Sequence, residues 1–295
     1  MGKDFYEKSN IAKRTFDDAN RILGFDLASL AFSGPDERLN QTDMSQPAIF
    51  VTTIASYHAG VVADVLDEQG VEHYAGLSLG EYTALCLAGV FSFEDGLKLV
   101  AARGKFMQEA AVATPSSMVA IMGGDEPTVT RLCAEAAQGD VLVPANFNAP
   151  GQIVVSGSKR ACERIVTSAG VAGFKAVPLT VAGAFHSPIM QPAADRMAAE
   201  LEKVQFHHPS GNPRVVYSNV TAEPHTDAAS IKRLLVDQIV KPVRWEQTMQ
   251  KIAPVADARF VELAPGRVLT GLLKKINRRL PVDSLATAEA LNPPA

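Results

Sequence analysis

The chain has 295 residues, of which 47% are hydrophobic and 20% charged, and its formal net charge is −4. This balance is typical of a globular protein and argues against wholesale binding to nucleic acid or to a membrane surface. No apolar run reaches the ~18 residues that a membrane span needs, and the charged N-terminus has no apolar signal core. Three scattered cysteines, Cys86, Cys133 and Cys162, indicate reduced, inert thiols, so we expect a cytoplasmic protein.

The first part of the chain is expected to be mainly helical. The segment after residue 46 is apolar on most faces, which predicts a well-buried helix, and Gly24 and Ser92 are typical end and start signals. The predicted elements are helices over 10–23, 47–69, 81–88 and 92–111 and a strand over 71–75.

The middle of the chain, residues 113–183, changes character. It is expected to contain strands over 117–122, 141–147, 152–156 and 174–181 and helices over 126–137 and 161–169. The order β-α-β-β-α-β is typical of a ferredoxin-like subdomain. We therefore expect residues 113–183 to be inserted into a larger domain made of residues 1–112 and 184–295.

The larger domain resumes with alternating helices and strands. After a helix that follows Pro188, the prediction is a strand over 214–218, a helix over 230–239, a strand over 259–263 and a helix over 268–279. Strands that alternate with helices favour a mostly parallel sheet covered on both faces. The expected fold class is therefore α/β.

A possible nucleophile lies in the turn Gly76-Leu77-Ser78-Leu79-Gly80, which matches the pattern G-x-S-x-G. A strand is predicted before it and a helix after it, as in a nucleophile elbow. Ser78 would then lie at a helix N-terminus, where the backbone N–H of Leu79 can stabilise an oxyanion. On the pentapeptide alone, an ordinary serine in a glycine turn is an equal alternative.

A serine hydroxyl needs a base, and the chain has six histidines. His186 precedes Ser187 and Pro188, which form a good helix start, so it is expected at the end of an ordered loop. The residues alone do not choose among the six histidines.

Seven segments, in order along nearly the whole chain, resemble one family. These are residues 76–85, 103–108, 146–152, 183–188, 218–220, 242–245 and 264–272. The family is that of the malonyl-CoA:acyl-carrier-protein transacylases, which is related to the acyltransferase domains of polyketide synthases. The resemblance implies a hydrolase-like α/β domain with a mostly parallel sheet and a ferredoxin-like insertion.

The resemblance also implies roles for single residues. Ser78 is expected to be the nucleophile and His186 its base, in a dyad in which the backbone carbonyl of Gln238 holds the histidine. Arg103 would grip the free carboxylate of a malonyl group. The alternative for Arg103 is a surface arginine paired with an acid such as Glu109.

Four further positions are expected to line the substrate site. Phe185 leaves little room for an α-branched acyl group, and Met107 belongs to the motif that contains Arg103. Asn219 matches a polar position of the family, although it also fits a strand-end turn. Leu77 is a departure, because many relatives carry histidine there.

The expected reaction is transfer of malonyl from malonyl-CoA to acyl carrier protein, for fatty acid biosynthesis, by a monomer that needs no cofactor or metal. The helix with Lys274, Lys275, Arg278 and Arg279 could attract the acidic carrier protein, or could simply be a solvated face. The alternatives are a serine thioesterase, a polyketide-type acyltransferase acting in trans, and an inactive homologue that serves as a binding subunit.

The start of the chain also departs from the family. Relatives usually begin with a strand and a Gly-Gln-Gly-Ser-Gln loop that supplies a second oxyanion N–H. No such segment precedes Met1, and loss of one donor of this kind costs roughly 10²- to 10³-fold in rate. We expect a start site assigned too far downstream, with a truncated or inactive chain as the alternatives.

Overall fold

The computed structural model describes residues 1–207, 214–255 and 258–292, and the chain folds into two compact units. The first unit comprises Met1–Gly104, Val204–Val216 and Ala253–Ala295, and the second comprises Lys105–Lys203 and Tyr217–Ile252. The expected insertion, residues 113–183, lies wholly within the second unit. Its boundaries stay a prediction.

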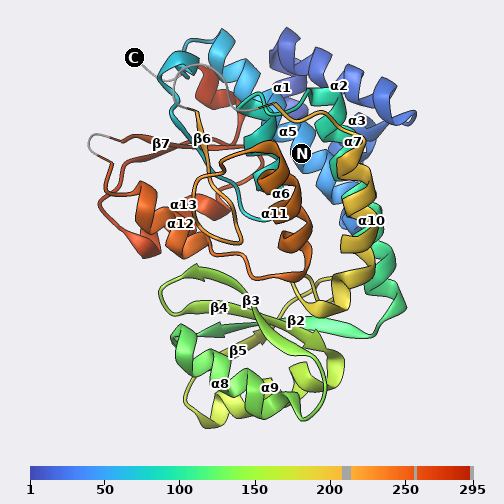
Figure 1. Cartoon of the computed structure of the whole chain (residues 1–295). Coiled ribbons are helices and arrows are strands. Elements are labelled where there is room, and N and C mark those ends of the chain that lie inside the picture. The colour runs from blue at the N-terminus through green and yellow to red at the C-terminus, as the bar shows by residue number, and fades with distance from the viewer. Residues whose placement is uncertain (208–213, 256–257, 293–295) are drawn as a thin grey trace. The chain divides into compact units, whose positions relative to one another are not determined.

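Helices dominate the first unit (Figure 1). Its described helices are α1 (Lys3–Lys8), α2 (Asn10–Leu23), α3 (Leu27–Ser33), α4 (Asp36–Leu39), α5 (Thr42–Val62), α6 (Leu79–Leu87), the first half of α7 (Phe93–Ala113), α13 (Val268–Ile276) and the short 3₁₀ segments Glu68–Gly70 and Ala288–Leu291. Helix α2 has the predicted bounds, because the Ser9 hydroxyl caps its first turn and Gly24 takes φ 75° at its end.

The buried helix expected over 47–69 is α5, and both of its ends differ from the prediction. It begins at Thr42, so that Pro47 lies inside it, and it ends at Val62. The long buried surface of α5 outweighs the local penalty of the proline. Asp64 then adopts φ 55°, a conformation that no helix continues, and this ends α5 early.

The strands of the first unit form two parallel pairs. β1 (His73–Tyr74) pairs with β6 (Val215–Val216), and β7 (Phe260–Leu263) pairs with β8 (Val282–Leu285). Parallel pairing was expected, but one continuous sheet is not seen among the described residues. β1 and β6 are also shorter than predicted, because only two residues of each make ladder hydrogen bonds.

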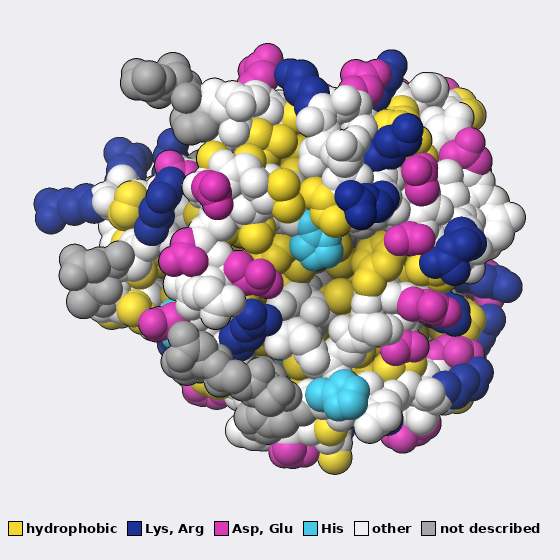
Figure 2. Space-filling model, turned by 90° about the horizontal axis from the view of Figure 1, so that it is seen from above, with side chains coloured by type: hydrophobic (Ala, Val, Ile, Leu, Met, Phe, Trp, Pro, Cys, Tyr) yellow, Lys and Arg dark blue, Asp and Glu magenta, His cyan; other side chains and the backbone are white. Residues whose placement is uncertain are grey.

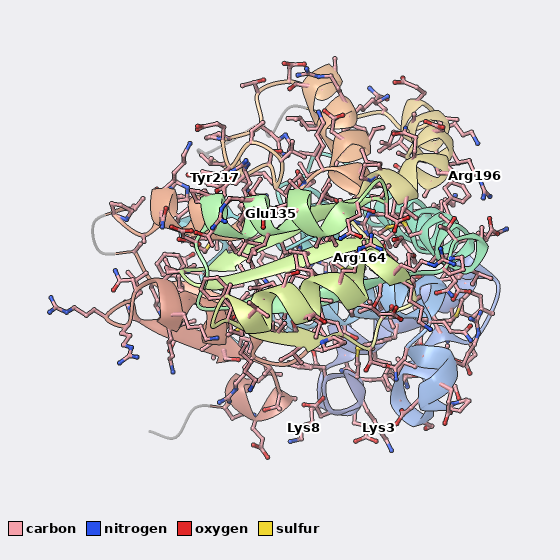
Figure 3. All side chains as sticks on the ribbon, turned by 90° about the horizontal axis from the view of Figure 1, so that it is seen from below. Lys3, Lys8, Glu135, Arg164, Arg196 and Tyr217 are labelled. Atoms are coloured by element: carbon pink, nitrogen blue, oxygen red, sulfur yellow. The ribbon has the colours of Figure 1, made fainter. Side chains whose placement is uncertain are left out.

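One antiparallel sheet of four strands forms the centre of the second unit. β2 (Ser116–Met122), β3 (Leu142–Ala149), β4 (Gln152–Ser158) and β5 (Lys175–Pro178) lie in the order β3-β4-β2-β5. Helices α8 (Glu126–Ala137) and α9 (Lys159–Val171) lie side by side on one face of this sheet (Figure 3). The element order is the predicted one, and α8 has the predicted bounds because Asp125 caps it.

The remaining helices of the second unit are the end of α7, the 3₁₀ turn Pro188–Met190, α10 (Gln191–Glu202), α11 (Ala228–Val240) and α12 (Trp245–Ile252). Between α11 and α12, Val243 hydrogen-bonds to the backbone of Ala145 and Phe147 and so extends the edge of the sheet beside β3. This pairing brings together two of the segments that carry the family resemblance.

Two observations concern the apolar and charged side chains of the described helices and of the surface in Figure 2. None of the described helices has the length and apolar character that a membrane crossing requires. Over the face in Figure 2, acidic and basic side chains are interspersed, as on an ordinary globular surface.

Candidate active site

Ser78 occupies a sharp turn between β1 and α6 in the first unit. Its backbone angles are φ 54° and ψ −106°, which residues with a Cβ rarely adopt. Glycine is required at position 76, because a Cβ there would lie 2.1 Å from the carbonyl carbon of Gly80. The Ser78 side chain does not cap α6, although it stands at the capping position. The strained turn thus directs the hydroxyl away from its own helix.

Leu77 and Leu79 flank the serine. Leu79 is buried and is the first residue of α6. Because it lies in the first turn, its backbone N–H has no hydrogen-bond acceptor within the helix. The carbonyl of Leu77 accepts a hydrogen bond from Gly80 N at 3.0 Å, which closes the turn. The turn therefore presents an N–H beside the serine, as an oxyanion site requires.

Arg103 is buried beside this turn, with an exposed fraction of 1%. Its Nη2 donates a hydrogen bond of 3.1 Å to Ser78 Oγ, and its Nη1 donates one of 2.6 Å to Gln46 Oε1. The alternative of a surface arginine paired with Glu109 is wrong, since Glu109 forms an ion pair with Arg196. A buried guanidinium that donates to a serine hydroxyl in this way is also able to bind a carboxylate.

Burial and two neighbouring side chains act on the charge of Arg103. Burial lowers the pKa of the guanidinium from its ordinary value, while Tyr82 and Glu81 act in the opposite direction. Its centre lies 5.4 Å from the centroid of the Tyr82 ring, and burial raises the pKa of that phenol. Arginine nevertheless stays protonated in proteins, so the site keeps a positive charge in a low-dielectric setting.

Gly104 allows α7 to approach the N-terminus of α5. A Cβ at this position would lie 2.6 Å from the carbonyl oxygen of Thr42 and 3.1 Å from the α-carbon of Asp43. Both are backbone atoms, which cannot move aside cheaply. This close approach places Arg103, the preceding residue, within reach of Gln46.

His186 lies in the second unit, where it is 3% exposed and adopts φ 56°. Its Nδ1 lies 2.7 Å from the backbone carbonyl oxygen of Gln238, near the end of α11. A carbonyl can only accept, so this contact requires a proton on Nδ1 and leaves Nε2 as the basic nitrogen of the neutral ring. The expected contact between the histidine and this carbonyl is thus present.

The loop that carries His186 is fastened by two serines. The Ser187 hydroxyl donates to the carbonyl of Ala184 at 2.6 Å and also caps the 3₁₀ turn that begins at Pro188. Ser116, at the start of β2, accepts a hydrogen bond of 3.1 Å from Ala184 N. These bonds hold the histidine in a left-handed conformation that it would otherwise adopt rarely.

Phe185, next to His186, packs against the face of the sheet that α8 and α9 leave uncovered. The buried members of this small cluster are Met118, Ala145 and Val154. The side chain of Phe185 is therefore held against the strands, while its backbone belongs to the loop that carries His186.

The other expected site residues are placed as follows. Met107 and Asn219 are buried in the second unit, and the carbonyl of Asn219 accepts from Arg244 N at 2.8 Å. Lys274 and Lys275 are exposed on α13 in the first unit. The helix predicted over 268–279 ends at Ile276, so Arg278 and Arg279 lie beyond it, because the Asn277 backbone is extended.

The structure thus places two pairs of the expected residues in contact, one pair in each unit. The first unit joins Ser78 to Arg103, and the second joins His186 to Gln238. Two partners were not anticipated, Gln46 and Ser116. Gln46 was missed because the predicted helix began one residue after it, and Ser116 because a lone serine at the start of a strand carries no sequence signal.

Among residues 1–207, 214–255 and 258–292, no group of three or more His, Cys, Asp or Glu side chains is arranged so that it could hold a metal ion. The three cysteines are unbridged there, and burial raises the pKa of Cys86 and Cys133 to about 12 and that of Cys162 to about 11.

Comparison with known proteins gives matches over nearly the full chain. The family described as acyl transferase domain matches residues 1–292. The malonyl CoA-acyl carrier protein transacylase of Salmonella typhimurium is 43% identical over 97% of this chain and 89% of the relative, and that of Bacillus subtilis is 39% identical over 99% and 90%.

Solved structures agree with this result. The malonyl CoA-acyl carrier protein transacylase of Coxiella burnetii superposes with a TM-score of 0.93 at 36% identity, over 99% of this chain and 90% of that one. A malonyl-transacylase in complex with a type II PKS acyl-carrier protein gives a TM-score of 0.91 at 37% identity, over 99% and 93%. The chain belongs to the malonyl-CoA:acyl-carrier-protein transacylase family of acyltransferases.

Proposed function

We propose that this chain transfers malonyl from malonyl-CoA to the phosphopantetheine thiol of acyl carrier protein, through a malonyl ester on Ser78. The observation that carries the proposal is the hydrogen bond between the buried guanidinium of Arg103 and Ser78 Oγ. A cation fixed at the nucleophile suits a cargo with its own carboxylate, and malonyl is such a cargo whereas acetyl is not.

In the first half-reaction, His186 pairs with Ser78. Nε2 takes the hydroxyl proton while Oγ attacks the thioester carbon, and the backbone N–H of Leu79 stabilises the resulting oxyanion. The C–S bond then breaks, and coenzyme A leaves as the thiol with the proton from His186. The carbonyl of Gln238 stabilises the imidazolium that forms in between.

In the second half-reaction, the carrier's thiol attacks the ester carbon of malonyl-Ser78. His186 removes the thiol proton and returns it to Ser78 Oγ as the C–O bond breaks. The products are malonyl-carrier thioester and regenerated enzyme, so the kinetics are ping-pong. Neither step, as proposed, requires a cofactor or a metal.

Selectivity among acyl groups is assigned to the residues around the two reacting side chains. Arg103 holds the malonyl carboxylate in a bidentate grip and so orients the thioester toward Ser78. Phe185 limits the space for an α-branch, which disfavours methylmalonyl. Leu77, Met107 and Asn219 line the same acyl site and complete its surface.

We also infer finer features of the fold and its setting. The strand order β3-β4-β2-β5 with two helices on one face supports a ferredoxin-like subdomain, inserted at 113–183 into a hydrolase-like domain. The cations Lys274, Lys275, Arg278 and Arg279 would attract the acidic carrier protein. The enzyme would act as a monomer in the cytoplasm, without binding nucleic acid or membranes.

The test is incubation with malonyl-CoA followed by intact-mass measurement and peptide mapping. A malonyl adduct on Ser78, absent from the Ser78→Ala variant, is expected, and addition of holo acyl carrier protein should discharge it to the carrier. Release of malonate to water at the same rate with and without the carrier would indicate a thioesterase instead. Lack of any adduct would contradict the proposal.

A second candidate differs only in the carrier that is served. The match to a malonyl-transacylase bound to a type II PKS acyl-carrier protein is as strong as the matches to the other solved structures. A polyketide-type role in trans is therefore compatible with the same pairs of residues. Competition between a fatty-acid carrier and a polyketide carrier, measured as the ratio of kcat/KM, separates the two roles.

A further inference from the structure

An ion pair between Arg38 and Asp43 joins α4 to the first turn of α5. Nη1 and Nη2 of Arg38 donate to the two carboxylate oxygens of Asp43 at 2.9 and 2.8 Å, so the contact is bidentate. The pair is partly exposed, with 41% of the Arg38 side chain and 20% of the Asp43 side chain accessible to solvent. A bidentate pair fixes the geometry of both side chains, which a surface ion pair with a single contact does not.

The start of α5 is fastened by this pair instead of by a capping side chain. Gln41 stands at the N-cap position of α5, but its side chain makes no capping hydrogen bond and its Oε1 accepts from Arg38 Nη1. A carboxylate in the first turn of a helix is favoured by the helix dipole, and Asp43 supplies one. Through that carboxylate, Arg38 ties the first turn of α5 to the preceding segment of the chain.

The turn that contains Asp43 is also the one that α7 approaches most closely. A Cβ on Gly104 would lie 2.6 Å from the carbonyl oxygen of Thr42 and 3.1 Å from the α-carbon of Asp43. One turn further along α5, Gln46 Oε1 accepts from Nη1 of Arg103 at 2.6 Å. Residues three and four positions apart lie on the same side of a helix, so these contacts form one continuous junction between α5 and α7.

We propose that Asp43, held by Arg38, is a positioning residue that sets where the Arg103 guanidinium lies and so favours acyl groups with a free carboxylate. The inference rests on the proposed function and assigns part of its selectivity to two residues outside the acyl site. A productive grip needs its groups placed to within about 0.5 Å, so a small shift of the first turn of α5 weakens the hold on malonyl. Acetyl has no carboxylate and loses nothing at this point.

The test compares Arg38→Gln, Asp43→Asn and the double variant with the parent enzyme. Each single variant should lower the ratio of kcat/KM for malonyl-CoA to that for acetyl-CoA by about three- to fivefold, as expected for a partly exposed ion pair. The fall should come from a higher KM for malonyl-CoA, with little change in kcat. Both single variants break the same contact, so the double variant should lower the ratio no further than either single one.

The matched control is Arg164→Gln, in the second unit. Arg164 forms a similar ion pair with Asp140 at 2.7 Å, with 27% and 37% of the two side chains exposed, and it also donates to the carbonyls of Ala136 and Ala137. Its loss should therefore lower stability at least as much as the loss of Arg38, measured by thermal melts. The ratio for the two thioesters should nevertheless stay at the parent value.

Salt provides a readout that general destabilisation would not move. Rising ionic strength screens a partly exposed ion pair, so the ratio in the parent should fall toward that of Arg38→Gln, while the ratio in the variant changes less. Parent-like ratios in Arg38→Gln and Asp43→Asn, an equal fall in Arg164→Gln, or the same salt dependence in Arg38→Gln and parent would each overturn the inference. If the parent itself forms no malonyl ester on Ser78, the proposed function fails, and the two failures are thereby distinguished.

Discussion

The guanidinium of Arg103 donates to the hydroxyl of Ser78 at 3.1 Å, so one side chain serves both the nucleophile and, in our proposal, the cargo. Its other terminal nitrogen, Nη1, donates to Gln46 Oε1 at 2.6 Å, and this second bond fixes the plane of the guanidinium group. In our proposal, this one group therefore couples the class of substrate to the orientation of the Ser78 hydroxyl.

Replacing Arg103 by lysine should separate charge from geometry. Lysine keeps the positive charge but cannot reach Gln46 and Ser78 with a planar fork. We expect kcat/KM for malonyl-CoA to fall by about 10- to 100-fold, the range for loss of a hydrogen bond to a charged group, while that for acetyl-CoA changes much less. Equal losses for both thioesters would show that Arg103 orients only Ser78.

The glycine beside Arg103 offers a test with a matched control in the same helix. Gly104→Ala pushes a Cβ against the backbone of Thr42, whereas Gly96→Ala pushes one against the Phe50 and Phe91 rings. Both should destabilise folding by about 1–3 kcal/mol, as overpacking does. Only Gly104→Ala should also lower the preference for malonyl-CoA over acetyl-CoA, because it shifts the part of α7 that carries Arg103.

Thermal melts and competition between the two thioesters measure these effects. A loss of selectivity in Gly96→Ala as large as that in Gly104→Ala would mean that selectivity follows general stability. The close approach at Thr42 would then have no special role.

Ser116 should prove to be a positioning residue for His186. Ser116→Ala leaves the backbone N–H of Ala184 without its 3.1 Å acceptor, which destabilises the histidine loop by about 1 kcal/mol. We expect kcat for Ser78 malonylation to fall several-fold with little change in KM. The neighbouring Ser117→Ala is the control, since the residue points to the other face of β2. A pH profile identical to that of the parent and an unchanged kcat in Ser116→Ala would contradict this role.

The buried cysteines predict how stability changes at high pH. Burial raises the pKa of Cys133 in the folded chain to about 12, from an ordinary value of 9.0. The unfolded thiol therefore loses its proton first, so the free energy of unfolding is unaffected below pH 9 and falls as the pH rises above it. Urea unfolding at pH 8 and at pH 10 measures this fall.

A Cys133→Ala variant, compared with itself at the same two pH values, is the control for that experiment and should lose less stability between them. At pH 8 the folded chain should react slowly with iodoacetamide at all three cysteines, since little thiolate is present. Rapid labelling of the folded chain would contradict the burial described for these thiols.

Local patterns predicted several elements to the residue. The capping serine and terminal glycine of α2, and the aspartate that caps α8, act within one helical turn, so no distant contact is needed to fix these ends. α5 was misjudged at both ends because its limits depend on burial against the rest of its unit. The helix expected to reach Arg279 stops at Ile276 for a similar reason, since only two of its leucines are held by the core.

Short stretches of sequence were sufficient to predict the tight turn at Ser78, the β-α-β-β-α-β order and the family, and the family resemblance then singled out His186 among the six histidines. The chemistry of such stretches is set by neighbours in the chain. The burial of Arg103 against Ser78 and Gln46 became known from the folded chain alone, whereas the contact between His186 and the Gln238 carbonyl was expected only through the family resemblance. These pairs join residues far apart in the chain, and their formation depends on how helices and strands pack, which no local pattern encodes.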